Sequence, residues 1–68
     1  MTISFGANLR FLRERKNLSQ EDLARKLRIS RQSISKWEQG ISYPGILYLV
    51  PLTKILDCTL DELLKGLE

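Results

Sequence analysis

Apolar residues recur at spacings of three and four along most of the chain, and turn-forming residues divide this pattern into five short segments. The first predicted helix runs from about Phe5 to Lys16, behind a cap at Ser4. Its apolar stripe consists of Phe5, Leu9 and Leu12. Gly6 lowers the intrinsic stability of this helix. Because no segment alternates between apolar and polar residues as a strand does, we expect an all-α fold of five short helices.

Serine caps predict where the second and third helices begin. Ser19 precedes the second helix, and Asp22 stands at the capping-box position three residues later. Ser30 precedes the third helix, which should end at residue 39 because Gly40 is suited to a left-handed stop. Only two residues then separate the second helix from Ser30. The buried face of the second helix is predicted to comprise Leu23, Ala24 and Leu27.

A third cap predicts the fifth helix, where Thr59 and Glu62 form another capping box. Each of the three caps lies between an apolar residue just before it and a second apolar residue four positions into the helix. Such a hydrophobic staple fixes the angle at which the chain enters a helix. The three staple pairs are Leu18 with Leu23, Ile29 with Ile34, and Cys58 with Leu63.

The fourth predicted helix, roughly Gly45 to Leu56, is apolar almost all round, which is typical of a central helix. Pro51 falls beyond its first turn, so it should remove one backbone hydrogen bond and kink the helix. Alternatively, residues 44–50 form an irregular turn and the helix begins at Pro51.

Length and composition narrow the range of functions. With 68 residues, the chain is expected to form one domain over 1–68, and its single cysteine and lack of histidine argue against disulfides, a zinc site or any other cofactor. Residues 40–53 contain no charge, but this stretch is too short to cross a membrane. The first residues lack the pattern of a signal peptide, so we expect a cytoplasmic protein.

Charge is unevenly distributed along the chain. Residues 1–40 contain nine Lys/Arg and four Asp/Glu, for a net charge of +5, whereas residues 41–68 contain two and four, for −2. This asymmetry suggests one face made for a polyanion. On the third helix, one arc of a helical wheel contains only Arg31, Ser35, Gln39, Gln32 and Lys36. These side chains suit the base edges of a DNA groove, although a plain solvated face is the alternative.

The opposite arc of the third helix is formed by Ser33, Ile34, Trp37 and Glu38. Two segments, Leu18-Ser19-Gln20-Glu21-Asp22-Leu23-Ala24 and Ile29 to Gly40 with its Trp-Glu-Gln-Gly ending, resemble the Cro/phage-repressor-like (XRE) helix-turn-helix family. The similarity continues through Pro44, Leu49, Leu52, Leu56 and the segment Leu60-Asp61-Glu62-Leu63-Leu64. It implies a compact five-helix, lambda-repressor-like fold in which the second and third helices form the helix-turn-helix.

The resemblance also implies roles for individual residues. The third helix would lie in the major groove while the second crosses the DNA backbone above it. The implied base contacts are Arg31, Gln32, Ser35 and Lys36. The implied phosphate contacts are Ser19, Gln20, Ser42 and Tyr43, although the loop that contains Ser42 and Tyr43 lacks the basic residues frequent in the family.

Five further residues are implied to be structural. Ala24 lets the second and third helices approach each other, and Trp37 belongs to the core. Gly40 ends the third helix. Glu38, on the apolar side of that helix, needs a partner, which the family pattern supplies as Arg13. We therefore expect a partly buried Arg13–Glu38 ion pair with an architectural purpose.

These observations predict a transcriptional regulator that binds double-stranded DNA at a palindromic operator as a homodimer. Leu60, Leu64 and Leu67 exceed what one small core needs, so the C-terminal helices are the candidate dimer surface, although all three leucines could equally be core. The alternative is a protein-interaction module such as an antitoxin or a phage accessory factor. An enzyme is not expected, because the residues assemble no acid–base or nucleophilic constellation.

Overall fold

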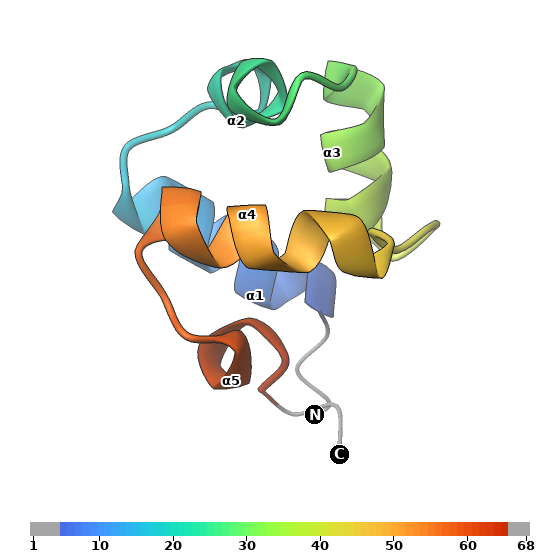
Figure 1. The fold of residues 1–68 in the computed structure, drawn as a ribbon. Coiled ribbons are helices and arrows are strands. Elements are labelled where there is room, and N and C mark those ends of the chain that lie inside the picture. Colours follow the sequence, from blue (N-terminus) through green and yellow to red (C-terminus); the bar gives the residue numbers. More distant parts are fainter. Residues whose placement is uncertain (1–4, 66–68) are drawn as a thin grey trace.

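The computed structural model describes residues 5–65, which form five helices and no strand (Figure 1). The helices are α1 (Phe5–Arg15), α2 (Gln20–Leu27), α3 (Arg31–Gln39), α4 (Ile46–Leu56) and α5 (Leu60–Leu63). The prediction of five short helices is confirmed. The first helix ends one residue before the predicted Lys16, and its predicted cap, Ser4, lies outside the described residues.

The predicted caps are present. Ser19 and Thr59 each form both hydrogen bonds of a capping box, with Asp22 and Glu62 respectively. The Ser30 hydroxyl accepts a hydrogen bond from the Ser33 amide and starts α3. Gly40 ends α3 with a left-handed φ of 76°, a conformation that glycine adopts without strain.

Arg28, which ends α2, also has a left-handed backbone, with a φ of 59°. This conformation lets the chain turn within three residues from α2 into α3. A left-handed backbone is unfavourable for an arginine, because the Cβ approaches the following carbonyl oxygen. No sequence signal indicated this strained position, since the pattern predicted only the length of the turn.

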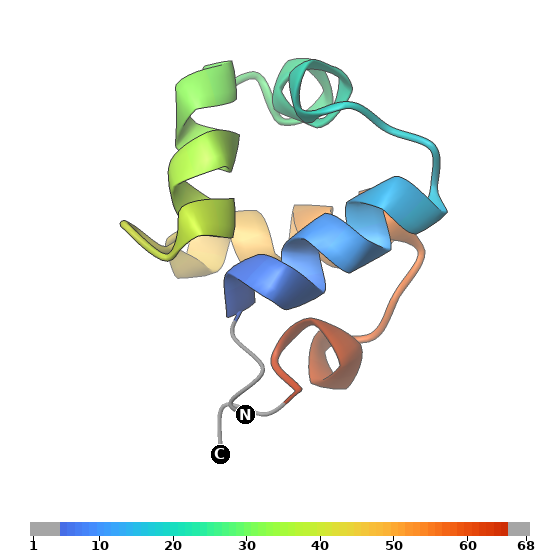
Figure 2. The ribbon, with the colours of Figure 1, turned by 180° about the vertical axis from the view of Figure 1, so that it is seen from behind.

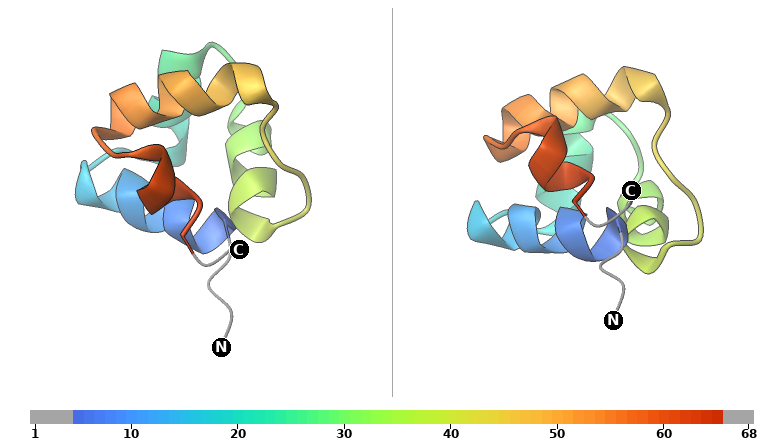
Figure 3. Two further views of the ribbon diagram at one scale, coloured as in Figure 1. Left: turned by 60° about the horizontal axis from the view of Figure 1, so that its bottom comes forward. Right: turned by 90° about the horizontal axis from the view of Figure 1, so that it is seen from below.

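The core is formed by one group of apolar side chains from all five helices. In Figures 1 and 2, α4 and α1 lie on opposite sides of the domain, with α2 and α3 beyond one edge and α5 beyond the other. Figure 3 shows the same helices tilted with the bottom forward and, on the right, seen from below. The fully or almost fully buried apolar residues are Phe5, Leu9, Leu12, Leu23, Ala24, Ile34, Trp37, Leu52, Leu56 and Leu63.

The prediction that the fourth helix is a central, buried helix is wrong. Helix α4 runs without a break from Ile46 past Pro51, so the alternative start at Pro51 is also wrong. Leu52 and Leu56 are fully buried, but the side of α4 that faces outward includes Ile46 at 80% exposure and Leu47 at 85%. Such a small core has room for one face of α4 only. A kink at Pro51 stays a prediction.

Gly6 lies where α1 meets the end of α3. A Cβ atom built on Gly6 would lie 2.8 Å from the Trp37 carbonyl oxygen and 2.7 Å from the Glu38 carbonyl carbon. Real Cβ atoms do not approach other atoms this closely. The glycine therefore permits close contact between the two helix backbones, a role that its low helix propensity did not indicate.

Helix α5 is attached to α1 by Asn8, whose side-chain amide donates hydrogen bonds to the carbonyl oxygens of Leu63, at 3.0 Å, and Lys65, at 2.8 Å. Leu63 is the last residue of α5 and Lys65 follows it, so neither carbonyl has a partner within the helix. Nothing in the sequence distinguished this asparagine from a surface residue.

Candidate nucleic-acid interface

The predicted polar arc of α3 lies on one outward face. Arg31, Gln32 and Lys36 are exposed, and Ser35 is half-buried. On the other side of the helix, Ile34 has no exposed surface and Trp37 has 6%. The two buried side chains set the rotation of α3 about its axis, so the four predicted base-contacting residues share a face open to a partner.

Gln39 extends this face by one further turn. Its amide donates a 2.7 Å hydrogen bond to the Ser35 hydroxyl. The amide therefore holds Ser35, which lies one turn earlier. Gln39 was placed on the polar arc from the sequence but was not included among the predicted DNA contacts. The structure joins it to one of them.

Beneath the polar face, Arg13 of α1 meets Glu38 of α3. The Arg13 Nε donates to Glu38 Oε2 at 2.6 Å, and Nη2 donates to Oε1 at 3.1 Å. The two side chains are only 9% and 5% exposed. Arg13 Nη1 also donates to the carbonyl oxygen of Leu18 at 2.7 Å. The contact implied by the family pattern is thus present, and it joins α1, α3 and the segment before α2.

The hydrogen bonds to Glu38 and its negative charge raise the pKa of Arg13, against the opposing effect of burial. The Arg13 guanidinium therefore stays protonated and keeps its N–H donors. A two-pronged arginine–carboxylate contact is directional as well as strong. It fixes the orientation of the Glu38 carboxylate relative to α1.

Gln20, at the start of α2, connects this ion pair to the polar face. Its amide nitrogen donates to Glu38 Oε1 at 3.0 Å, and its amide oxygen accepts from Arg31 Nη1 at 3.3 Å. The side chain is half-buried. Sequence reasoning expected an outward-facing phosphate contact here and did not expect these two hydrogen bonds.

Ser19, the other predicted phosphate contact of this region, is engaged in its capping box. Its hydroxyl oxygen accepts from the Asp22 amide at 2.9 Å, and its own amide donates to Asp22 Oδ2 at 3.0 Å. The hydrogen bond from the Ser19 backbone lowers the pKa of Asp22. The Ser19 hydroxyl is exposed, and its proton remains available to an acceptor at the positive end of α2.

The loop after α3 supplies the remaining predicted contacts. The Ser42 amide donates to the Lys36 carbonyl oxygen at 3.4 Å, so the loop folds back over the end of α3. The Tyr43 ring packs edge-on against Phe5 with centroids 6.0 Å apart, yet 65% of the residue is exposed. Much of Tyr43 is therefore accessible to another molecule, but the loop contributes no charge.

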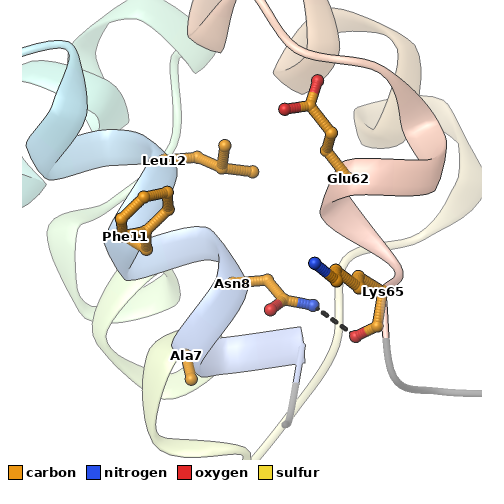
Figure 4. Close-up of a pocket in the computed structure, with 6 residues that line it drawn as sticks. All are labelled: Ala7, Asn8, Phe11, Leu12, Glu62 and Lys65. Atoms are coloured by element: carbon orange, nitrogen blue, oxygen red, sulfur yellow. Dashed lines mark hydrogen bonds between the residues drawn. The ribbon is translucent and has the colours of Figure 1, made fainter.

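A hollow of about 330 Å³ lies elsewhere, between α1 and α5 (Figure 4). It is lined by Ala7, Asn8, Phe11, Leu12, Glu62 and Lys65. None of these residues belongs to α2 or α3. The hydrogen bond from Asn8 to Lys65 drawn in Figure 4 is the one that attaches α5 to α1. The hollow is thus separate from the polar face.

Other kinds of site find little support among residues 5–65. No cluster of potential metal ligands is found in this part of the chain. Burial raises the pKa of the Cys58 thiol, which keeps it protonated and poorly nucleophilic. No helix between residues 5 and 65 has the length and apolar character needed to span a membrane.

Similarity to known proteins extends along almost the entire chain. A model of the helix-turn-helix family matches residues 9–63. The transcriptional activator BcrR of Enterococcus faecalis is 47% identical over 66 residues, which make up 97% of this chain and 32% of that protein. The transcriptional regulator DicA of Escherichia coli is 36% identical over 64 residues, covering 94% of this chain and 47% of DicA. The chain thus spans about a third of the length of BcrR and about half of the length of DicA.

Solved structures show the same fold. The P22 c2 repressor, in a complex with a synthetic operator, superimposes with a TM-score of 0.87 at 34% identity, over 96% of this chain and 98% of that one. The controller protein C.AhdI of Aeromonas hydrophila superimposes with a TM-score of 0.78 at 36% identity, covering 87% and 89%. The predictions of a lambda-repressor-like fold and of a family of transcriptional regulators are confirmed. The chain belongs to the helix-turn-helix family, in its Cro/phage-repressor-like (XRE) group.

Proposed function

We propose that this chain binds DNA sequence-specifically as a transcriptional regulator, with α3 in the major groove of a palindromic operator and two copies on the operator. The observation that carries the proposal is the outward face of α3, which presents Arg31, Gln32 and Lys36 above a buried, hydrogen-bonded support. The P22 c2 repressor, which superimposes on nearly all of this chain, was solved with operator DNA.

The side chains of this face match the chemistry of base edges. Arg31 and Lys36 donate hydrogen bonds, as contact with guanine O6 and N7 requires. Gln32 both donates and accepts, which suits adenine N6 and N7. The Ser35 hydroxyl adapts to either. These four residues are proposed to contact bases, while Ser19, Gln20, Ser42 and Tyr43 contact phosphates.

A single short helix contacts only a few base pairs, so two copies are needed for specificity. In proteins of this type, half-sites lie about 34 Å apart, one turn of the double helix, and the symmetry of the operator mirrors that of the dimer. A palindromic operator and a homodimer are therefore proposed together.

The surface best suited to a second copy is an apolar patch on α4 and α5, formed by Ile46, Leu47, Val50 and Leu60. Their exposed fractions are 80%, 85%, 59% and 46% respectively. Residues 40–53 contain no charge, so the part of the patch formed by α4 can meet its counterpart about a two-fold axis without bringing like charges together. A hollow of about 360 Å³ lies within the patch, where Ile46, Val50 and Leu60 form part of its lining, and it would receive a side chain such as Leu47 from the second copy.

This patch differs in part from the predicted dimer surface. Leu60 is exposed, as that prediction required. Leu64 is half-buried and packs on the core, and Leu67 lies outside the described residues. The greater part of the patch comes from α4, because that helix turns an apolar side outward.

Binding is tested by selecting bound sequences from a random duplex pool and then measuring affinity for the recovered site. Arg31→Ala is expected to weaken binding by about 1–3 kcal/mol and to relax the preference at one position of each half-site. Lys54→Ala, which removes one positive charge from α4, is the matched control. Selection that recovers no common sequence would contradict the proposal.

The dimer is tested by Leu47→Asp, which should lower the affinity for a complete palindrome and leave the affinity for a half-site unchanged. Leu47 is 85% exposed, so the substitution should not disturb the fold. Phe11→Asp is the control, because Phe11 is a 63% exposed apolar residue outside the patch. Equal effects of the two substitutions on palindrome binding would count against the α4 surface.

A further inference from the structure

The last residue of α3, Gln39, makes a hydrogen bond within the polar face. Its Nε2 donates to the Ser35 hydroxyl oxygen at 2.7 Å. Long side chains on a helix lean toward the N-terminus of that helix, so Gln39 covers the residue one turn earlier. The N-terminal residues of a recognition helix lie nearest the bases, which places Ser35 closer to them than Gln39. Gln39 can therefore act on a base through Ser35.

This hydrogen bond determines which part of the Ser35 hydroxyl is left for a partner. A hydroxyl has one hydrogen to donate and two lone pairs that accept. Because Gln39 is the donor, it occupies one lone pair and leaves the hydrogen unused. Within residues 5–65, the Ser35 hydroxyl donates no hydrogen bond. Its hydrogen is therefore free for an acceptor outside this part of the chain.

A serine inside a helix also has a competing partner in the backbone. Its hydroxyl can donate to the carbonyl oxygen four residues earlier, which for Ser35 is that of Arg31. In that arrangement the hydrogen is used within the helix, and only lone pairs remain for a partner. The contact with Gln39 competes with this arrangement and keeps the hydrogen available.

We infer that Gln39 is a specificity-determining positioning residue, which makes the Ser35 hydroxyl a hydrogen-bond donor toward DNA bases. The inference rests on the proposed function, in which Ser35 contacts a base. In the major groove, guanine presents the acceptors O6 and N7, and thymine presents the acceptor O4. Cytosine presents only the N4 donor, and adenine presents one donor and one acceptor. Ser35 should therefore prefer guanine or thymine to cytosine at its operator position.

This role differs from a direct contact between Gln39 and DNA. A serine hydroxyl that rotates freely donates to one base and accepts from another, so it distinguishes bases poorly. Gln39 restricts that choice before DNA binds, and its effect lies in the ratio of the affinities for two bases. A phosphate contact made by Gln39 itself would strengthen binding to all sequences alike.

The test first locates the operator position that Ser35 contacts. Sequences are selected from a random duplex pool with the wild type and with Ser35→Ala, and the position whose preference is lost in Ser35→Ala is assigned to Ser35. At that position the wild type should favour guanine or thymine over cytosine by about two- to tenfold, the contribution of one hydrogen bond. A wild-type preference for cytosine there, or no position altered by Ser35→Ala, would overturn the inference.

Two substitutions of Gln39, an exposed residue, then change the contact without disturbing the core. Gln39→Met keeps the length of the side chain and removes the donor, so the preference should fall by about twofold or more. Gln39→Glu offers only acceptors and would take the serine hydrogen, so the preference should shift toward cytosine. In a Ser35→Ala background, which is the control, neither substitution should change the preference at this position.

A measurement on the free protein separates positioning of the hydroxyl from contact with DNA. NMR scalar couplings of the Ser35 β-protons should indicate one χ1 rotamer in the wild type and an average over rotamers in Gln39→Met. The same spectra show that the variant is folded.

An unchanged base preference in Gln39→Met, with unchanged Ser35 couplings, would show that the amide does not position the hydroxyl and would overturn the inference. A Gln39→Glu protein with the wild-type preference would also overturn it, because a carboxylate cannot donate to Ser35. The proposed function would survive both results, since selection would still recover a common sequence. A wild type that recovers no common sequence would overturn the proposed function, and the inference with it.

Discussion

Helix propensity and packing give opposite expectations for the stability of the Gly6→Ala variant. Judged by helix propensity alone, alanine should stabilise α1 by about 1 kcal/mol, because glycine is the poorer helix former. In the folded chain, however, Gly6 lies against the end of α3. The new methyl group would meet backbone atoms of Trp37 and Glu38, which cannot rotate away as a side chain would.

The size of the effect follows from these distances. A Cβ at Gly6 would be 2.7 Å from the Glu38 carbonyl carbon and still closer to its oxygen, whereas ordinary contact begins at 3.4 Å. The two helices would have to separate by more than about 0.7 Å. Overpacking of this kind typically costs about 1–3 kcal/mol, and contact with backbone favours the upper end. After subtraction of the propensity gain, Gly6→Ala should destabilise the protein by about 2 kcal/mol.

Thermal unfolding followed by circular dichroism measures the effect, and a loss of about 2 kcal/mol lowers the Tm of a domain this small by about 8–16 °C. Gly45→Ala is the control, because a Cβ there meets nothing within 4 Å. As Gly45 precedes α4, that change should cost less than about 1 kcal/mol. A Tm of Gly6→Ala equal to or above that of the wild type would refute the close approach of α1 and α3.

Three further predictions concern stability. Arg13→Ala leaves the Glu38 carboxylate buried without its main partner and should cost about 3–5 kcal/mol in chemical denaturation; an unchanged midpoint would exclude the ion pair. Arg28→Gly relieves a left-handed backbone and should stabilise the protein by about 1 kcal/mol in the same assay, whereas a loss would mean that the arginine side chain matters more than the strain. The pKa values of Asp22 and Glu62 are lowered, so their ionised carboxylates stabilise the fold above about pH 4, and this stabilisation is lost as the pH falls below the unfolded-state pKa values. Asp22→Asn should therefore make the free energy of unfolding depend less on pH in the acid range. An equally steep dependence in the variant would argue against the cap.

Much of the fold was accessible from the sequence because its signals are local. A capping box such as that of Ser19 and Asp22 depends on residues three positions apart, and Gly40 marks a helix end by its own conformational freedom. The rotation of α3 followed from its wheel, since apolar and polar residues separate into opposite arcs. The Arg13–Glu38 pair required more than local pattern, because 25 residues separate the partners, and only the family resemblance indicated it.

The features that sequence reasoning missed depend on distances between elements. The outward apolar side of α4 was taken for a buried one, because hydrophobicity alone does not show how many faces of a helix a small core can cover. Gly6 was seen as a weak helix former because its neighbour in space, Glu38, lies 32 positions further along the chain. The hydrogen bonds of Gln20 likewise became visible only once α2, α3 and α1 were placed together.

The distribution of charge indicates which side chains could provide affinity for DNA phosphates in the proposed complex. The loop after α3 has no positive charge, and the Tyr43 ring packs against Phe5. In residues 5–65, the basic side chains of α2, α3 and the turn between them are Arg25, Lys26, Arg28, Arg31 and Lys36. Each phosphate that they neutralise adds a slope of about 0.9 to the salt dependence. One copy offers only these basic side chains within the helix-turn-helix for phosphate contacts. The proposed α4 patch would join two copies and so double the number of phosphate contacts without a basic loop.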